Sequence, residues 1–182
     1  MTMRYNTKIM AVTRSKLEII SLEDAKRYMG LAIEDAYLGI KNGDGGPFGA
    51  TFVRVSDGEI LATTHNTVLK NNDSTEHAEM NGIRMTAKKL GNWDLSGTIA
   101  FSTTEPCPMC FSALHWARVD VVYYGTSIED VKRIGFNELS IPNIDMKNLG
   151  KSNLVIVRDF MLEECLALLD YYKKNCMDAV RY

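Results

Sequence analysis

The sequence predicts an α/β domain of three layers, in which helices cover both faces of a five-stranded mixed sheet. Segments with the composition of strands alternate with segments of helical spacing, in the order α-β-β-α-β-α-β-α-β-α. The first two strand segments are separated by Ser56-Asp57-Gly58, which is typical of a hairpin, so these strands should pair antiparallel. The later strands alternate with helices, so they should run parallel through right-handed crossovers.

The first helix is expected to begin after Ser21 and to end near Gly43. The motif S-L-E-D at 21–24 resembles a capping box, in which a serine and an acidic residue satisfy the first amides of a helix. Apolar residues then recur at helical spacing, at positions 22, 25, 29, 32, 33, 36 and 40. The motif G-G-P at 45–47 breaks the chain before the next strand.

The other elements are bounded by turn and loop residues. Strands are expected over 49–55, 59–64, 98–104, 119–125 and 154–157, and further helices over 75–90, 108–117, 128–134 and 161–175. Gly91 is placed as a helix stop, because glycine adopts the left-handed conformation that often follows a helix. Pro106 and Pro108 permit a helix to begin there, since proline is tolerated in a first turn. The segments 70–74 and 139–152 are expected to be loops.

Composition and charge narrow the classes of function. The chain has 182 residues, of which 46% are apolar and 24% charged, as in ordinary globular domains. The formal net charge is −2, and basic residues form only short pairs such as Lys88-Lys89, so a nucleic-acid backbone is not expected as a partner. No apolar run reaches the roughly 18 residues of a membrane span. Residues 1–16 lack the continuous apolar stretch of a secretory signal, so a cytoplasmic location is expected.

Three potential zinc ligands occur at the predicted starts of two helices. His77 lies in the motif H-A-E at 77–79, and Cys107 and Cys110 lie in the motif P-C-P-M-C at 106–110. Cysteine binds metals as the thiolate, and a helix N-terminus lowers the pKa of a thiol. Three protein ligands leave one coordination position open, which is typical of catalytic zinc, whereas structural zinc is held by four. One zinc ion per chain is therefore expected.

Two alternative interpretations fit these motifs less well. A redox C-x-x-C would leave the histidine motif without a role, and a structural zinc site would need a fourth ligand. Neither His65 nor His115 has suitable spacing for that ligand. Glu79 favours the catalytic interpretation, because it follows His77 by two positions and would lie beside the metal without binding it. There, a carboxylate can move a proton between water and substrate.

The pair of motifs H-x-E and P-C-x-x-C is the signature of the zinc nucleobase deaminases. The chain resembles the cytidine-deaminase-like superfamily over residues 21 to 160, and within it the bacterial guanine deaminases. The resemblance includes the proline between the two cysteines and four further stretches: G-P-F-G-A at 46–50, H-N-T-V at 65–68, N-D-S-T at 72–75 and W-A-R at 116–118. It implies the cytidine-deaminase-like fold, with the zinc site at two helix N-termini.

The resemblance also implies roles for residues outside the ligand set. Glu79 would be the catalytic acid and base. Glu138, in the motif G-F-N-E at 135–138, would contact the reacting amino group and assist proton transfer. Some members carry aspartate there, so glutamate is a mild departure that lengthens the reach of the carboxyl group. The candidate contacts to the substrate are Asn66 at the purine edge, Phe48 stacked on the base, the backbone of Ala78, Trp116 and Tyr182.

These inferences predict a zinc-dependent enzyme that hydrolyses guanine to xanthine and ammonia. One alternative is a tRNA adenosine deaminase, which would need a basic face. A second is a deaminase of another small ring, such as cytosine, guanosine or an aminotriazine. A third is an inactive homologue that serves as a binding module. The expected partners are a small purine and a second copy of the chain in a homodimer. Residues 1–20 are expected to form an extension, 21–160 the deaminase domain, and 161–182 a helix and tail that close the active site.

Overall fold

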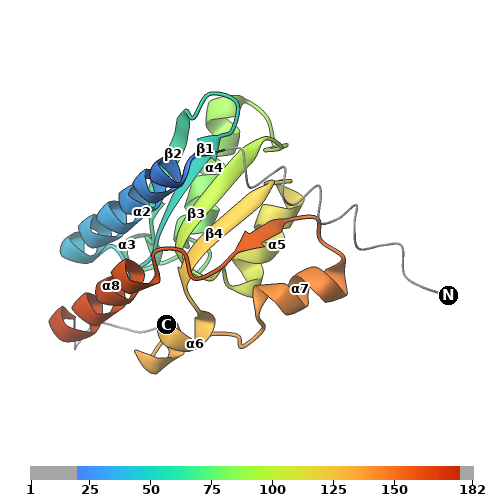
Figure 1. The fold of residues 1–182 in the computed structure, drawn as a ribbon. Helices are drawn as coiled ribbons and strands as arrows, with labels where there is room; N and C mark the ends of the chain where they lie inside the picture. Colours follow the sequence, from blue (N-terminus) through green and yellow to red (C-terminus); the bar gives the residue numbers. More distant parts are fainter. Residues whose placement is uncertain (1–19, 177–182) are drawn as a thin grey trace.

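The computed structural model describes residues 20–176, which form a five-stranded sheet with helices on both faces (Figure 1). The strands are β1 (Gly49–Arg54), β2 (Ile60–His65), β3 (Thr98–Thr104), β4 (Val121–Thr126) and β5 (Val155–Val157). Their spatial order is β2-β1-β3-β4-β5. Strand β1 is antiparallel to both β2 and β3, whereas β3, β4 and β5 are parallel. The predicted mixed sheet and its first hairpin are thus confirmed.

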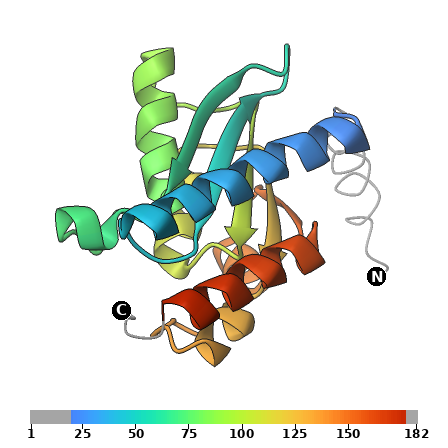
Figure 2. The same cartoon turned by 90° about the vertical axis from the view of Figure 1, so that its left-hand side faces the viewer.

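Two pairs of helices cover the two faces of the sheet (Figure 2). Helices α2 (Leu22–Asn42) and α8 (Leu162–Asn175) lie on one face, and α4 (Ala78–Leu90) and α5 (Pro108–Trp116) lie on the other. Successive side chains of a strand point to opposite faces. Phe52 therefore packs toward α4 and α5, whereas Val53 packs toward α2. The result is the three-layer arrangement that the sequence predicts.

The ends of α2 and α4 follow the predicted signals. Oγ of Ser21 accepts a hydrogen bond from the backbone N of Asp24 at 3.0 Å, which satisfies one of the free amides at the start of α2. Gly43 and Gly91 end the two helices with φ angles of 71° and 62°, a left-handed conformation that glycine adopts without a side-chain clash. Although α2 has 21 residues, neither it nor any other described helix has the apolar length of a membrane span.

Three stretches differ from the predicted elements. Helix α4 begins at Ala78 instead of residue 75, because Oδ1 of Asp73 accepts hydrogen bonds from N and Oγ1 of Thr75 and holds this stretch in a turn. The short helix α3 (Val68–Asn71) overlaps the start of the predicted loop 70–74, and helix α7 (Asn143–Gly150) lies within the predicted loop 139–152. Neither has a clear apolar periodicity, so the pattern of residues does not reveal them.

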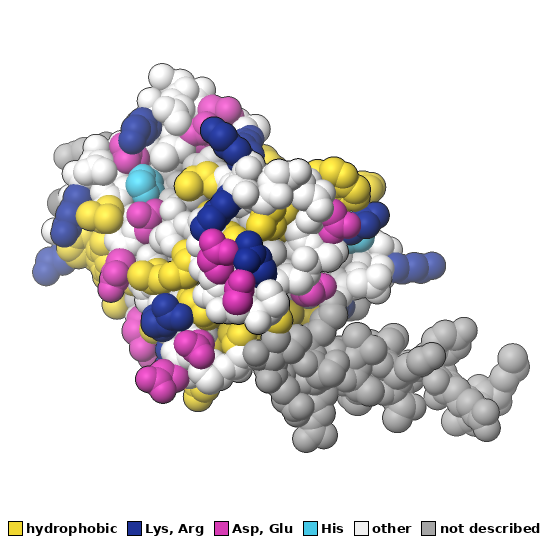
Figure 3. All heavy atoms as spheres, turned by 90° about the horizontal axis from the view of Figure 1, so that it is seen from above, with side chains coloured by type: hydrophobic (Ala, Val, Ile, Leu, Met, Phe, Trp, Pro, Cys, Tyr) yellow, Lys and Arg dark blue, Asp and Glu magenta, His cyan; other side chains and the backbone are white. Residues whose placement is uncertain are grey.

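The face of the molecule seen from above in Figure 3 carries intermingled acidic and basic side chains. At the β1–β2 turn, Arg54 pairs with Asp57 and with Glu59, both at 2.8 Å, and Lys89 of α4 pairs with Glu59 at 2.9 Å. Binding to a phosphate backbone uses clustered basic charge that is free to meet it. The basic side chains at this turn are paired with carboxylates, so they do not form such a free cluster.

Helices α4 and α5 begin at the same edge of the sheet. Helix α5 follows the carboxyl end of β3, and α4 begins beside the end of β2, where Oγ1 of Thr64 donates to the carbonyl of Ala78 at 2.8 Å. Residues at the two helix starts are therefore close in space although about thirty positions separate them in the sequence. This edge is where the predicted metal ligands lie.

Candidate active site

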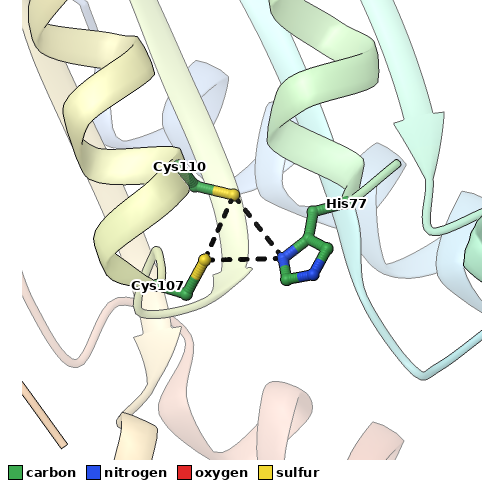
Figure 4. A group of neighbouring side chains, drawn as sticks. All are labelled: His77, Cys107 and Cys110. Carbon is green, nitrogen blue, oxygen red and sulfur yellow. Dashed lines mark hydrogen bonds between the residues drawn. The ribbon is translucent and has the colours of Figure 1, made fainter. Parts of the chain in front are cut away.

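Two helix starts bring His77, Cys107 and Cys110 together in one cluster (Figure 4). His77 is the N-cap of α4 and Cys107 is the N-cap of α5, with Cys110 in the first turn of α5. Sγ of Cys107 lies 3.5 Å from Nδ1 of His77 and 3.6 Å from Sγ of Cys110, which itself lies 3.6 Å from Nδ1. Among residues 20–176, this is the group of side chains whose arrangement suits a metal ion.

The three distances match those of a tetrahedral zinc site. With Zn–S bonds of about 2.3 Å and Zn–N bonds of about 2.0–2.1 Å, tetrahedral angles place two sulfurs about 3.8 Å apart and a sulfur and a nitrogen about 3.6 Å apart. A disulfide needs a separation of about 2.05 Å, so the 3.6 Å between Cys107 and Cys110 excludes one. Two thiolates and one imidazole therefore fit zinc and leave one coordination position open.

The side chains of the cluster strongly affect one another's protonation. The hydrogen bond between the Cys107 and Cys110 side chains lowers the pKa of Cys107 to about 4, and His77 adds to this effect. The same bond, together with burial, raises the pKa of Cys110 well above its ordinary value. Burial opposes a charge on His77, but its hydrogen bond with Cys107 and the nearby negative charges raise its pKa overall. Binding of a metal here releases protons, because the ligands must be deprotonated.

Glu79 lies beside the cluster and is only 6% exposed. Its Oε2 lies 3.4 Å from Sγ of Cys110, and its Oε1 lies 3.0 Å from Oγ of Ser102. Burial raises the pKa of Glu79, and the negative charge of Cys107 adds to the increase. A carboxyl group with a raised pKa takes up and releases a proton closer to neutral pH, which is what general acid–base catalysis requires.

Glu138 approaches the same cluster from a different part of the chain. It lies in the loop between α6 (Ile128–Arg133) and α7, and its side chain is half-buried. Burial raises the pKa of Glu138, and the charges of Cys107 and Glu79 add to the increase, whereas His77 opposes it. The cluster is thus accompanied by two carboxyl groups that are both easier to protonate than an exposed glutamate.

Asn66 and Phe48 are neighbours through their backbones, since N of Asn66 donates to the carbonyl of Phe48 at 3.0 Å. Oδ1 of Asn66 accepts hydrogen bonds from N of Gly46 at 3.4 Å and from N of Val68 at 3.1 Å, so Nδ2 is the end of the amide that can donate. The ring of Phe48 packs edge-on against Phe136 of the α6–α7 loop, with centroids 5.1 Å apart. These interactions fix Asn66 and Phe48, the candidate substrate-binding residues, relative to the α6–α7 loop that carries Glu138.

Residues 22–126 match the model of the cytidine and deoxycytidylate deaminase zinc-binding region. The match runs from α2 to β4 and includes His77, Glu79 and both cysteines of the cluster. The chain belongs to this family. Its fold is the cytidine-deaminase-like fold that the sequence predicts, and its family is one of zinc-binding deaminases.

Three relatives show how far the likeness to other deaminases extends. The guanine deaminase of Bacillus subtilis is 42% identical over 113 residues, which are 62% of this chain and 69% of that protein. The tRNA-specific adenosine deaminase of Buchnera aphidicola is 32% identical over 148 residues, which are 81% of this chain and 93% of that protein. The solved structure of a guanine deaminase from Nitrosomonas europaea superposes with a TM-score of 0.74 and 29% identity, over 81% of this chain and 83% of that one. The relatives agree on deamination and differ in substrate.

Three other predicted contacts of this deaminase site lie in different places. Ala78 is the first residue of α4 and is fully buried next to His77, and amides of a first helical turn have no partner within the helix. Helix α5 carries Trp116 about 13 Å along its axis from Cys107, and its contact with the substrate stays a prediction. The Trp116 side chain is 75% exposed at the far end of the helix. Tyr182 lies outside the described residues.

The sequence pattern does not single out Ser102, although this residue contacts Glu79. Ser102 lies on β3 and is only 2% exposed, and its Oγ is also 2.7 Å from the carbonyl of Thr104. A hydroxyl has one proton, so Ser102 donates to one of these two oxygens at a time. The sequence holds one clue to this contact. Ser102 lies in a buried strand, and a buried hydroxyl needs a hydrogen-bond partner.

Proposed function

We propose that this chain is a zinc-dependent guanine deaminase, which hydrolyses guanine to xanthine and ammonia. The observation that carries the proposal is the contact of a buried carboxyl group, Glu79, with a cluster of three metal ligands. A second carboxyl group, Glu138, is near enough for the charges of the cluster to shift its pKa. One carboxyl group can serve the attacking water and the other the leaving amino group. The 42% identity to the guanine deaminase of Bacillus subtilis supports guanine as the substrate.

His77, Cys107 and Cys110 are the residues that would hold one zinc ion. A zinc ion held there would lower the pKa of a water molecule from about 15.7 to about 7, and would so supply a nucleophile at neutral pH. The two thiolates offset the charge of the ion. The rest of the proposed chemistry belongs to the side chains around the cluster.

Glu79 accepts a proton from the attacking water as its oxygen bonds to C2 of guanine, and delivers this proton to a ring nitrogen. Glu138 contacts the exocyclic amino group. This group takes up a proton from the new hydroxyl through Glu79 or Glu138, the C2–N bond breaks and ammonia leaves. Asn66 holds the purine edge and Phe48 stacks on the ring. Guanine and water thus give xanthine and ammonia with no change of oxidation state.

The proposal also includes a homodimer and a pocket that the C-terminal tail closes, with Tyr182 in contact with the ligand. One packing contact supports a role for the tail. The ring of Tyr172, in the last turns of α8, lies 5.7 Å from the ring of Phe136. Helix α8 therefore packs, near its end, against the loop that carries Glu138.

A tRNA adenosine deaminase is the second candidate function. The observation that favours it is the alignment with the Buchnera aphidicola enzyme, which covers 93% of that protein. The net charge of −2 counts against it, because a grip on tRNA needs clustered basic side chains. Binding to tRNA would be visible as a gel shift that modest salt abolishes.

The test of the proposed function is ammonia release by the zinc-loaded protein from guanine, guanosine, adenine, cytosine, cytidine and a tRNA. The Glu79→Gln variant, purified in the same way, controls for a contaminating deaminase. We expect guanine to turn over well above the other substrates. Turnover of tRNA alone would overturn guanine and favour the second candidate, and turnover of another small ring would overturn only the assignment of the pocket.

A further inference from the structure

One buried carboxylate binds both ends of the segment that contains Glu138. Oε2 of Glu105 accepts a hydrogen bond from N of Ile128 at 3.3 Å, and Oε1 accepts one from N of Asn143 at 2.8 Å. Ile128 begins α6 and Asn143 begins α7, so Glu105 closes the 128–143 segment into a loop. Glu105 is 8% exposed and precedes the metal ligand Cys107 by two positions.

Asn143 makes a second link between this segment and the ligand-bearing chain. Its side chain is fully buried, and its Nδ2 donates to the carbonyl of Pro106 at 2.6 Å. Pro106 lies between Glu105 and Cys107. The 128–143 segment is therefore tied to two consecutive residues that directly precede a metal ligand, although more than thirty positions separate Asn143 from them in the sequence.

The middle of the 128–143 segment has few anchors of its own. Phe136 is buried against Phe48 and Tyr172, but Leu139 and Ile141 are 64% and 43% exposed. The hydrogen bond from Lys132 to Ser140 is exposed to solvent. The position of Glu138 thus depends on Phe136 on one side and on the links through Asn143 on the other.

We propose that Glu105 and Asn143 are positioning residues, which hold the 128–143 segment so that Glu138 faces the metal ligands. The inference rests on the proposed function in so far as Glu138 serves the leaving amino group. A displacement of about 1 Å in a catalytic group can lower the rate about 10²-fold. Loss of the links should therefore reduce turnover through Glu138 and leave the metal in place.

The first test is hydrogen exchange of the zinc-loaded protein, which needs no substrate. Glu105→Gln keeps the size of the side chain but replaces one acceptor oxygen with an NH₂ group, which cannot accept a bond from an amide. We expect exchange over residues 134–143 to be at least tenfold faster, and exchange in α4 to be unchanged. Thr86→Val is the matched control, because Thr86 is a buried polar residue on α4, which packs mainly against β1, β2, β3 and α5. Unchanged exchange in Glu105→Gln would overturn the proposal.

The second test is a double-mutant cycle with zinc content measured in every variant. Glu105→Gln and Glu138→Gln should each lower kcat/KM by about 10²-fold, and the double variant should be no slower than Glu138→Gln alone. Asn143→Ala should repeat the effect of Glu105→Gln. If the two single effects on kcat/KM multiply in the double variant, or if Glu105→Gln loses its zinc, the positioning role is overturned. If the protein releases no ammonia from guanine, the proposed function is overturned. The hydrogen-exchange experiment would still decide whether Glu105 and Asn143 position the segment.

Discussion

Sγ of Cys107 lies 3.5 Å from Nδ1 of His77, although the two residues are 30 positions apart in the sequence. The short distance arises because each residue caps a helix and both helices begin at one edge of the sheet. With Cys110 at 3.6 Å from both, the three donor atoms have the spacing of a tetrahedral zinc site. Metal binding should therefore depend on both helix starts.

Replacement of Cys107 by alanine should remove both zinc and deaminase activity, because two remaining ligands bind the metal weakly. Zinc content after dialysis is the measurement. Cys165→Ala is the matched control, since Cys165 is a buried thiol that packs between α8 and β4 on the other face of the sheet. The control should keep its zinc, and full zinc occupancy in Cys107→Ala would contradict the assignment of this ligand.

Replacement of Ser102 by alanine should slow deamination about tenfold without loss of zinc. Oγ of Ser102 lies 3.0 Å from Oε1 of Glu79, and a hydrogen bond to a charged group contributes about 1.5–3 kcal/mol. Loss of this bond leaves the catalytic carboxyl group less well oriented. Steady-state rates with zinc content as the control check this, and a wild-type rate would show that Ser102 does not act on Glu79.

His65 should make stability depend on pH. Its Nδ1 and Nε2 each lie 2.9 Å from a carboxylate oxygen, of Asp35 and Asp44 respectively. The hydrogen bond with Asp35 raises the pKa of His65 most, burial opposes it, and Asp44 adds to the increase. Because the pKa in the folded state lies above the unfolded value of about 6.5, the stabilisation is complete below about pH 6.5 and is lost as the pH rises through the folded pKa.

The measurement for this pH effect is the difference in Tm between the wild type and Asp35→Asn, taken at pH 6 and at pH 9. The variant removes the main partner of His65 and leaves the metal ligands in place. We expect the wild type to be the more stable at pH 6 and the difference to shrink at pH 9. A difference that is constant or grows with pH would show that His65 is not held as the charged form.

The helix ends and the metal-ligand cluster are predictable from the sequence, because each is encoded by a short motif. Gly43 and Gly91 mark the ends of α2 and α4, because a residue with positive φ is needed there. The three ligands and Glu79 are predictable for a similar reason, since zinc chemistry demands given residue types at helix starts. These features depend on a few neighbouring positions and not on distant contacts.

The features that the sequence does not reveal depend on contacts between distant segments. Helix α7 has weak periodicity, and its first residue is held by Glu105, which lies far from it in the sequence. The bond between Ser102 and Glu79 likewise joins two elements. The distance of Trp116 from the cluster likewise depends on the length of α5, which places Trp116 and Cys107 at opposite ends of the helix.

The most direct test of the central claim, that Glu79 moves protons at a zinc site, is the Glu79→Gln variant. Its zinc content and its rate of ammonia release from guanine are measured together. We expect zinc at the wild-type level and turnover reduced by at least about 10²–10⁴-fold, the contribution of general acid–base catalysis. A variant that keeps its zinc and deaminates at a rate near that of the wild type would contradict this role for Glu79.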